Sequence, residues 1–260
     1  MKKNLTVVLI IFALLAISYQ GVAYIPTAKQ ILQPILKANR KIDNLKIVLK
    51  TTIFDDRYDE GRMEIDERIY IKKGGIFRSE RDFAYGEEII INCGRKSLAM
   101  VKNIADTDYR KIDTVLPIAF FPKSIEDLIN DLNYLGVNTG TVAFDRIGRT
   151  VAFVIGERMG QIPCSQLWTE KETGFPLRFI GIGTSNGERV ILRAEYMNYT
   201  RVKRDFWFPA RIEFYRNDIL WVVSVPVKIL VNEKISDGFF TIPEGISFYS
   251  GLKDFLNVRE

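Results

Sequence analysis

The chain contains 260 residues, of which 47% are hydrophobic and 27% are charged, and these ordinary globular proportions exclude a disordered, collagen-like or low-complexity chain. The length leaves open one large β-rich domain or two small domains. The net charge of +5 is spread along the sequence, which contains no run of five or six like charges, so nucleic acid is not the expected partner. The sequence has no histidine, which excludes Ser-His-Asp and Cys-His mechanisms and every histidine-ligated metal site.

The amino-terminal segment has the three-part layout of a secretory signal peptide. Lys2 and Lys3 precede an apolar run from Leu5 to Ile17, and small residues end the segment at Ala23. This apolar run is shorter than the roughly 20 residues that a membrane-spanning helix needs. We therefore expect cleavage after Ala23 and export of residues 24–260, whose net charge is +3 because two lysines are removed from a total of +5.

The chain has two cysteines, Cys93 and Cys164. Two cysteines can pair in an oxidising compartment, but the sequence does not show whether their Cα atoms lie within bonding distance. A disulfide between Cys93 and Cys164 and two buried free thiols are both compatible with the sequence.

Apolar side chains at helical spacing predict two helices. The first covers Thr27 to Ile42. The second follows a capping residue at Ser124 and continues to Leu135, where Gly136 ends it. Each helix has one apolar stripe and one polar face.

Alternation of apolar and polar residues predicts strands through most of the remaining chain, from Leu45–Phe54 to Ile219–Val231. Turn signals such as Gly74-Gly75 and Asn217-Asp218 separate them. We expect a mainly β, α+β fold with a single curled antiparallel sheet of about ten to eleven strands, because long sheets of this kind curl. No linker or repeat divides residues 24–260, so we interpret them as one domain.

Three patterns that suggest chemistry have simpler interpretations. The acidic segment from Asp55 to Gly61 lacks the ligand order of a calcium loop, and the glycines from Gly181 to Gly187 lie between two strands, without a helix to hold a phosphate. Paired carboxylates such as Glu195 and Glu213 would permit a histidine-free hydrolase, but they alternate with apolar residues as on the solvent side of strands. We expect no catalytic residue, metal site or cofactor.

Large apolar side chains gather on one face of the predicted strands. Two helices with narrow apolar stripes are too small to cover a sheet of this size, so part of the face is expected to line a cavity. The competing interpretation is that these side chains fill a packed core. The residues expected to face inward and to line a lipid-binding wall are Leu49, Ile71, Phe153, Leu177, Phe179, Ile212, Phe214, Trp221 and Val223.

The segment LWTEKETGFPLR, from Leu167 to Arg178, resembles a hairpin of the LolA-like outer-membrane lipoprotein-sorting proteins. Three further features agree with that pattern: Tyr196–Val202 with Phe208–Ile212, the strand Val223–Val231 ending at Asn232, and Gly238–Phe240 before Ile242-Pro243. The resemblance implies an open half-barrel whose concave apolar face is covered by helices. It also implies a periplasmic, monomeric carrier that shields acyl chains and exchanges cargo with an inner-membrane transporter and an outer-membrane acceptor.

The leading hypothesis is therefore a non-enzymatic periplasmic carrier for the acyl chains of a lipoprotein or lipid. The energetic reason is general, because each buried methylene contributes about 0.8 kcal/mol without any specific polar contact. The alternative is an envelope-stress sensor or scaffold that uses the same fold to bind a protein partner. A carboxylate hydrolase is the third and weakest hypothesis.

Overall fold

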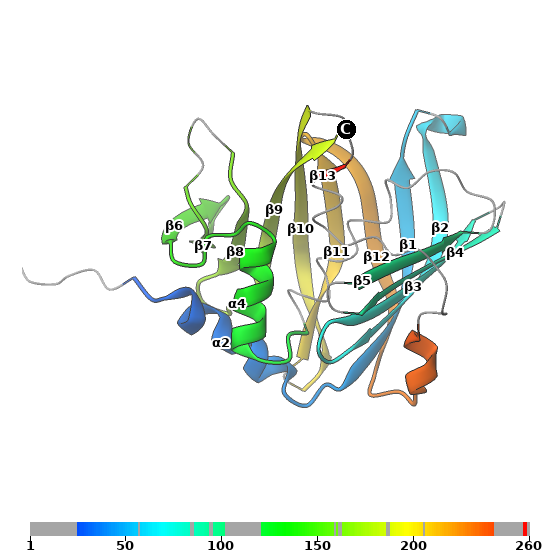
Figure 1. Cartoon of the computed structure of the whole chain (residues 1–260), viewed down its shortest axis with the longest axis horizontal. Coiled ribbons are helices and arrows are strands. Elements are labelled where there is room, and N and C mark those ends of the chain that lie inside the picture. The colour runs from blue at the N-terminus through cyan, green and yellow to red at the C-terminus, as the bar shows by residue number, and fades with distance from the viewer. Residues whose placement is uncertain are drawn as a thin grey trace, which may run out of the picture.

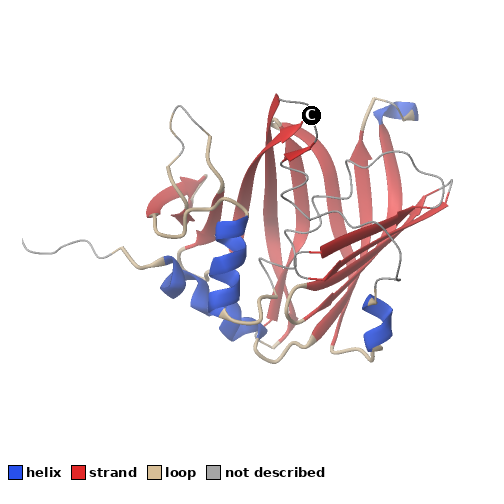
Figure 2. Cartoon of the chain, viewed as in Figure 1, coloured by secondary structure: helices blue, strands red, loops and turns tan. Residues whose placement is uncertain are grey.

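A single sheet organises the chain in the computed structural model, which describes residues 25–56, 58–83, 86–93, 96–101, 121–158, 160, 163–185, 188–204, 206–241 and 257–258. The expected signal peptide lies outside these residues. Two helices, two short 3₁₀ segments and the strands of one curved sheet make up the described part of the chain (Figures 1 and 2). The mainly β, α+β fold expected from the sequence is confirmed.

Hairpins of consecutive strands build each half of the sheet. The first half contains β1 (Asn44–Phe54), β2 (Arg62–Lys72), β3 (Ile76–Phe83), β4 (Gly86–Cys93) and β5 (Lys96–Val101). The second half contains β6 (Val142–Ile147), β7 (Thr150–Ile155), β8 (Gln166–Glu170), β9 (Pro176–Ser185), β10 (Glu188–Lys203), β11 (Phe206–Arg216) and β12 (Ile219–Val231). The short strand β13 (Asn257–Val258), which the sequence did not suggest, pairs in parallel with β9.

The two halves join where β1 pairs with β12, so strands from opposite ends of the chain form the middle of the sheet. The strand order is β5-β4-β3-β2-β1-β12-β11-β10-β9-β8-β7-β6. In the described structure β5 and β6 stand at the two ends of this order and do not pair, so the sheet stays open. It curls around its inner side, which we call the concave face (Figure 1).

Both helices begin at a capping residue, and the first ends at Asn39, before the expected Ile42. Helix α2 (Ala28–Asn39) begins with a capping box in which the Thr27 hydroxyl accepts from the Gln30 amide and the Gln30 side chain accepts from the Thr27 amide. Helix α4 (Ile125–Tyr134) begins at Ser124, whose hydroxyl accepts from the Asp127 amide. Neither helix in the described part of the chain is long and apolar enough to cross a membrane.

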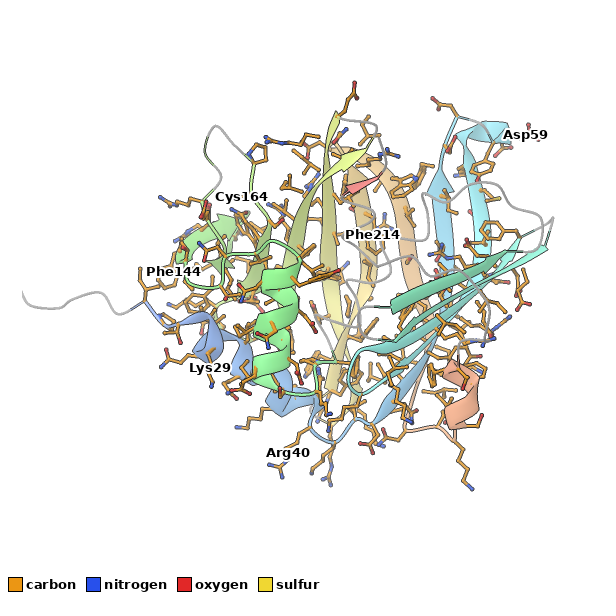
Figure 3. All side chains as sticks on the ribbon, in the orientation of Figure 1. Lys29, Arg40, Asp59, Phe144, Cys164 and Phe214 are labelled. Carbon is orange, nitrogen blue, oxygen red and sulfur yellow. The ribbon has the colours of Figure 1, made fainter. Side chains whose placement is uncertain are left out.

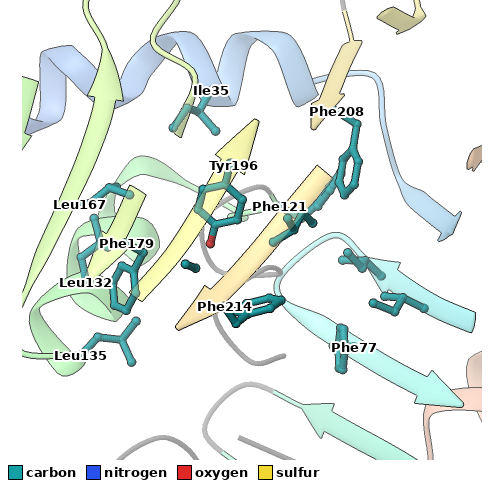
Figure 4. Packing of buried hydrophobic residues seen from close by; sticks show 14 of the residues in the cluster. Ile35, Phe77, Phe121, Leu132, Leu135, Leu167, Phe179, Tyr196, Phe208 and Phe214 are labelled. Carbon is teal, nitrogen blue, oxygen red and sulfur yellow. The ribbon is translucent and has the colours of Figure 1, made fainter. Parts of the chain in front are cut away.

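The two helices lie side by side over the concave face (Figures 1 and 4). The turn between β8 and β9 packs closely against α2. A Cβ added at Gly174 in this turn would lie only 3.0 Å from the Pro34 side chain of α2. Gly174 also has a φ of +75°, a backbone conformation that other residues rarely adopt. This close contact explains why the turn contains glycine.

The apolar core lies between the helices and the concave face. Side chains from both helices and from most strands of the described sheet form one buried cluster, which we call the main cluster. It includes Leu32, Leu128, Phe179, Tyr196 and Phe214, several of which are drawn in Figure 4. The opposite, convex face carries charged side chains such as Arg68, Glu195 and Glu213.

The side chain of Asn232, which follows β12, helps to hold the corner between α2 and β1. The Asn232 side-chain oxygen accepts from the backbone amide of Asp43 at 2.8 Å, and its amide nitrogen donates to the carbonyl of Lys41 at 3.0 Å. Asn232 has a φ of 59°, which asparagine tolerates better than most residues. Asn232 therefore fixes where the helix layer meets the middle of the sheet.

Replacing Asn232 with alanine should lower the free energy of unfolding by about 1 to 3 kcal/mol, because its side-chain hydrogen bonds to the backbone of Lys41, Asp43 and Asn44 are lost. Urea denaturation followed by circular dichroism measures the change. Asn198→Ala is the control, since Asn198 also has a positive φ, of 55°, while its side chain makes no such bonds among the described residues. Equal losses for the two variants would contradict the assignment of this role to Asn232.

Candidate functional site

The concave face brings together most of the residues that the sequence predicted for a lipid-binding wall. Seven of the nine belong to the main cluster or pack against it. Phe153 is partly buried, whereas the others are buried. The seven residues are Leu49, Ile71, Phe153, Phe179, Ile212, Phe214 and Trp221. Their role in binding a lipid stays a prediction.

Leu177 lies elsewhere because a β-bulge interrupts its strand. The register between β8 and β9 shifts between Trp168 and Thr169, so Trp168 pairs with Arg178 and Thr169 pairs with Pro176. A bulge leaves one residue without a direct partner and redirects its side chain. Leu177 consequently packs with Trp168 in a small second cluster outside the main one.

Val223 lies on the convex face, against the inward position that simple alternation predicts. Phe214 of the main cluster pairs directly with Val222, and Val223 pairs with Glu213. Residues directly opposite in a sheet share a face, so Val222 points inward and Val223 outward. The register between β11 and β12 shifts next to Tyr215, and Trp221 lies at this shift. Trp221 and its neighbour Val222 therefore both belong to the main cluster, and the alternation of inward and outward side chains along β12 is displaced by one residue.

A network of polar side chains crosses the concave face within the apolar wall, and we call it the inner polar network. The Glu67 carboxylate accepts from the Thr51 hydroxyl at 2.9 Å, the Ser79 hydroxyl at 2.7 Å and the Arg81 guanidinium at 3.0 Å. Arg81 also donates to Glu88 at 3.2 Å. The side chains of Arg81, Glu67 and Glu88 are only 6%, 2% and 2% exposed, so their charges are held in a nearly dry environment.

The inner polar network links five strands. Thr51 belongs to β1 and also meets the hydroxyl of Ser224 on β12 at 3.1 Å, while Glu67, Arg81 and Glu88 belong to β2, β3 and β4. Sequence reasoning missed these residues. The sequence does contain an indication of the buried position of Glu67. Buried isoleucines occupy alternate positions of this strand, at Ile65, Ile69 and Ile71, and Glu67 falls in the same series and so on the same face.

The carboxylates considered for a hydrolase occupy the convex face and are engaged by arginines. Glu195 accepts from Arg178 at 2.7 Å and from Arg193 at 2.9 Å. Glu213 accepts from Arg211 at 2.7 Å. Acids that are each paired with a guanidinium on the outside of the sheet do not form the cleft with two opposed carboxylates that glycoside hydrolysis requires.

Cys164 is a free thiol in this structure. Its sulfur donates to the backbone carbonyl of Glu157 at 2.9 Å, and burial raises the pKa of the thiol above its ordinary value. Cys93 ends β4, and its side chain lies outside the described ones. Cys164 is therefore unpaired in this structure, and it is partly buried rather than fully buried.

A pocket of about 650 Å³ opens at the carboxy-terminal end of α2, next to the hairpin that joins β10 and β11, and we call it the α2 pocket. Its floor includes Ile42 and Phe206, which are 4% and 2% exposed and belong to the main cluster. Five of its lining residues are cationic. They are Lys37, Arg40, Lys41, Lys203 and Arg204. Figure 3 shows Arg40 at the lower end of the molecule.

A second pocket, of about 360 Å³, lies on the other side of the last turn of α2. It shares Lys37 and Arg40 with the α2 pocket and adds Lys73 and Lys123. Lys73 also donates to the backbone carbonyl of Arg40 at 3.3 Å, which attaches the end of α2 to the turn after β2. The end of α2 is thus surrounded by positive charge on both sides.

Replacing Arg81 with methionine should lower the free energy of unfolding by about 3 to 5 kcal/mol, because the carboxylates of Glu67 and Glu88 lose a buried counter-charge. Arg68→Met is the matched control on the convex side of β2. Arg68 is 33% exposed, and one of its partners, Glu80, also binds Arg78, so its loss should cost less than about 1 kcal/mol. Urea denaturation of both variants measures the difference, and equal effects would rule out the buried network as a stabilising element.

Comparison with known proteins identifies the fold. No protein-family model matches the chain, and no curated protein matches its sequence. Among solved structures, a LolA superfamily protein from Nitrosomonas europaea is 12% identical, with a TM-score of 0.54 over 84% of this chain and 99% of that chain.

Two further solved structures agree with this match. A domain assigned to the outer membrane lipoprotein-sorting proteins, from Vibrio parahaemolyticus, is 8% identical, with a TM-score of 0.54 over 82% of this chain and 97% of that one. A DUF1329 family protein from Desulfovibrio piger is 10% identical, with a TM-score of 0.52 over 84% and 98% of the two chains. The chain therefore has the LolA-like fold that the hairpin from Leu167 to Arg178 suggested.

Proposed function

We propose that this chain is a non-enzymatic carrier that is exported to the periplasm and binds the acyl chains of a lipoprotein or lipid between the concave face and the two helices. The observation that carries the proposal is the position of the main cluster. Large apolar side chains of the sheet are covered by two short helices, so a space for acyl chains requires only that the helices separate from the sheet.

The contacts of the helix layer favour such a separation. The only ion pair between α2 and α4 among the described residues joins Lys29 and Glu126 at 2.7 Å, and these side chains are 58% and 64% exposed. Exposed pairs of this kind contribute about 0 to 1 kcal/mol. Apolar contact between the helices and the sheet therefore holds the helices in place. An acyl chain that enters between them can make equivalent apolar contacts with both.

The energy available from an acyl chain is sufficient for this exchange. Each methylene transferred from water contributes about 0.8 kcal/mol, so a chain of about fifteen methylenes gains on the order of 12 kcal/mol before the cost of moving the helices. The α2 pocket supports a route of entry, because its floor is formed by Ile42 and Phe206 of the main cluster.

Similarity of the fold to a solved structure also supports the proposed carrier function. One of the similar structures is a domain assigned to the outer membrane lipoprotein-sorting proteins, although the likeness by itself identifies only the fold. The segment that ends at Ala23 supports export. Under this proposal an inner-membrane transporter supplies the cargo and an outer-membrane acceptor receives it.

Binding of a fatty acid that carries a dansyl group tests the proposal on the mature protein. We expect its fluorescence to rise with a dissociation constant in the micromolar range. Phe214→Asp, which places a charge in the wall, should weaken binding by about tenfold or more, because a buried unpaired charge is unfavourable. Ile219→Asp, at a residue that is 73% exposed, is the control and should bind as the unchanged protein does.

Phe214→Leu keeps the wall apolar and should retain most of the binding, which separates loss of the site from loss of the fold. Native mass spectrometry of the purified protein provides a second measurement, with a bound lipid expected. Absence of both lipid and probe binding, together with recovery of one stoichiometric protein, would instead support the sensor or scaffold alternative.

A further inference from the structure

The α2 pocket combines positive charge and apolar surface in one opening. Five cationic side chains line it, and its described lining includes no carboxylate. Its apolar lining consists of Pro34, Ala38, Ile42 and Phe206. Its volume of about 650 Å³ falls within the range of ligand sites, which is about 300 to 1,000 Å³.

Helix electrostatics explains only part of this charge. Lys37 and Arg40 lie at the carboxy-terminal end of α2, where cations interact favourably with the helix dipole. Lys203 and Arg204 come from the β10–β11 hairpin, far away in the sequence, and belong to no helix. Two separate segments therefore direct positive charge at the same opening, although like charges repel each other.

The cations have no counter-charges in the described structure. No ion pair joins Lys37, Arg40, Lys41, Lys203 or Arg204 to a carboxylate among the described residues. Elsewhere on the surface arginines are paired, as Arg178 and Arg193 are with Glu195. An anion that enters the pocket would relieve the mutual repulsion of five positive charges.

The backbone around the pocket is held in place without a ligand. Asn232 donates to the carbonyl of Lys41, Lys73 donates to the carbonyl of Arg40, and Arg201 donates to the carbonyl of Arg204. Arg204 also has a φ of 31°, a conformation that is uncommon for a residue with a side chain and that concentrates at binding sites. The backbone positions of Arg40, Lys41 and Arg204 are thus fixed before binding.

We propose that the α2 pocket binds the phosphate group of an anionic lipid, with the lipid's acyl chains continuing over Phe206 and Ile42 into the main cluster. The inference rests on the proposed carrier function and narrows its cargo to a phosphate-bearing lipid. Free phosphate would satisfy the cations but leave the apolar floor without a partner, whereas a neutral acylated molecule would do the reverse. Only an anionic amphiphile matches both surfaces.

The test compares two fluorescent probes with identical acyl chains, NBD-labelled phosphatidic acid and NBD-labelled diacylglycerol, on the mature protein. We expect phosphatidic acid to bind at least about tenfold more tightly, and we expect the difference to shrink as salt is added, because exposed charges are screened. Inorganic phosphate should compete only weakly, since it cannot occupy the apolar floor.

The informative variant is Lys41→Glu/Arg204→Glu, because the backbone carbonyls of these two residues, and not their side chains, accept the hydrogen bonds from Asn232 and Arg201. It changes the charge of the pocket from +5 to +1, since three cations and two anions remain. Phosphatidic acid should lose its advantage, while the affinity for diacylglycerol should change by less than about twofold. Lys41→Gln/Arg204→Gln is a milder variant and should show an intermediate loss.

The matched control is Arg149→Glu/Arg189→Glu, which makes the same charge change at two exposed residues outside the pocket. Arg189 lies at the opposite end of β10 from Arg204. This control should keep the preference for phosphatidic acid. A control that loses the preference as fully as the pocket variant would show that net charge, not the pocket, selects the lipid.

The outcomes separate this inference from the carrier function. If both probes bind the unchanged protein equally, or if the pocket variant keeps the preference, the phosphate site is wrong and the carrier function survives. If inorganic phosphate displaces the lipid completely at equal concentration, the pocket is a phosphate site and not a lipid site. If neither probe binds, the carrier function and the lipid site are both wrong.

Discussion

The structure depends on keeping apolar side chains on one face of a sheet and charged side chains on the other. In a strand a shift of one residue exchanges the two faces, so the register of every pair determines whether the core is complete. The pairing of β1 with β12 is the central case, because it joins the two halves of the sheet. Bulges beside Trp168, Tyr215 and Leu49 adjust the register where simple alternation would place the wrong side chain inside.

The inner polar network is an exception to this division, because it places charged side chains on the apolar face of the sheet. Glu67, Arg81 and Glu88 are buried on the apolar face, and their charges are compatible with burial because they bind one another and nearby hydroxyls. A displaced register in β2, β3 or β4 would separate these partners and leave charges buried without hydrogen bonds. The network therefore selects one register in the half of the sheet that the described helices cover least (Figure 1).

The corner after α2 connects the fold to the proposed site. Asn232 and Lys73 hold the backbone of residues 40–44 against the middle of the sheet, and this places the cations at the end of α2 beside the β10–β11 hairpin. The same corner brings Ile42 into the main cluster. The positive charge of the α2 pocket and the apolar surface of its floor thus both result from the corner after α2. Because the pocket combines the two kinds of surface, we expect an amphiphile to fit it better than an ion does.

The sequence by itself predicted both helices, the cap at Ser124, most strands and the inward position of seven of the nine residues, because helical spacing, alternation and capping are local properties. The LolA-like fold was suggested by the resemblance of the hairpin from Leu167 to Arg178. Only the tertiary structure decided the outward position of Val223, the place of Leu177, the pairing of Arg81 with Glu67 and Glu88, and the meeting of Lys41 with Arg204. These features depend on register shifts and on contacts between segments far apart in the chain, and neither leaves a periodic signal in the sequence.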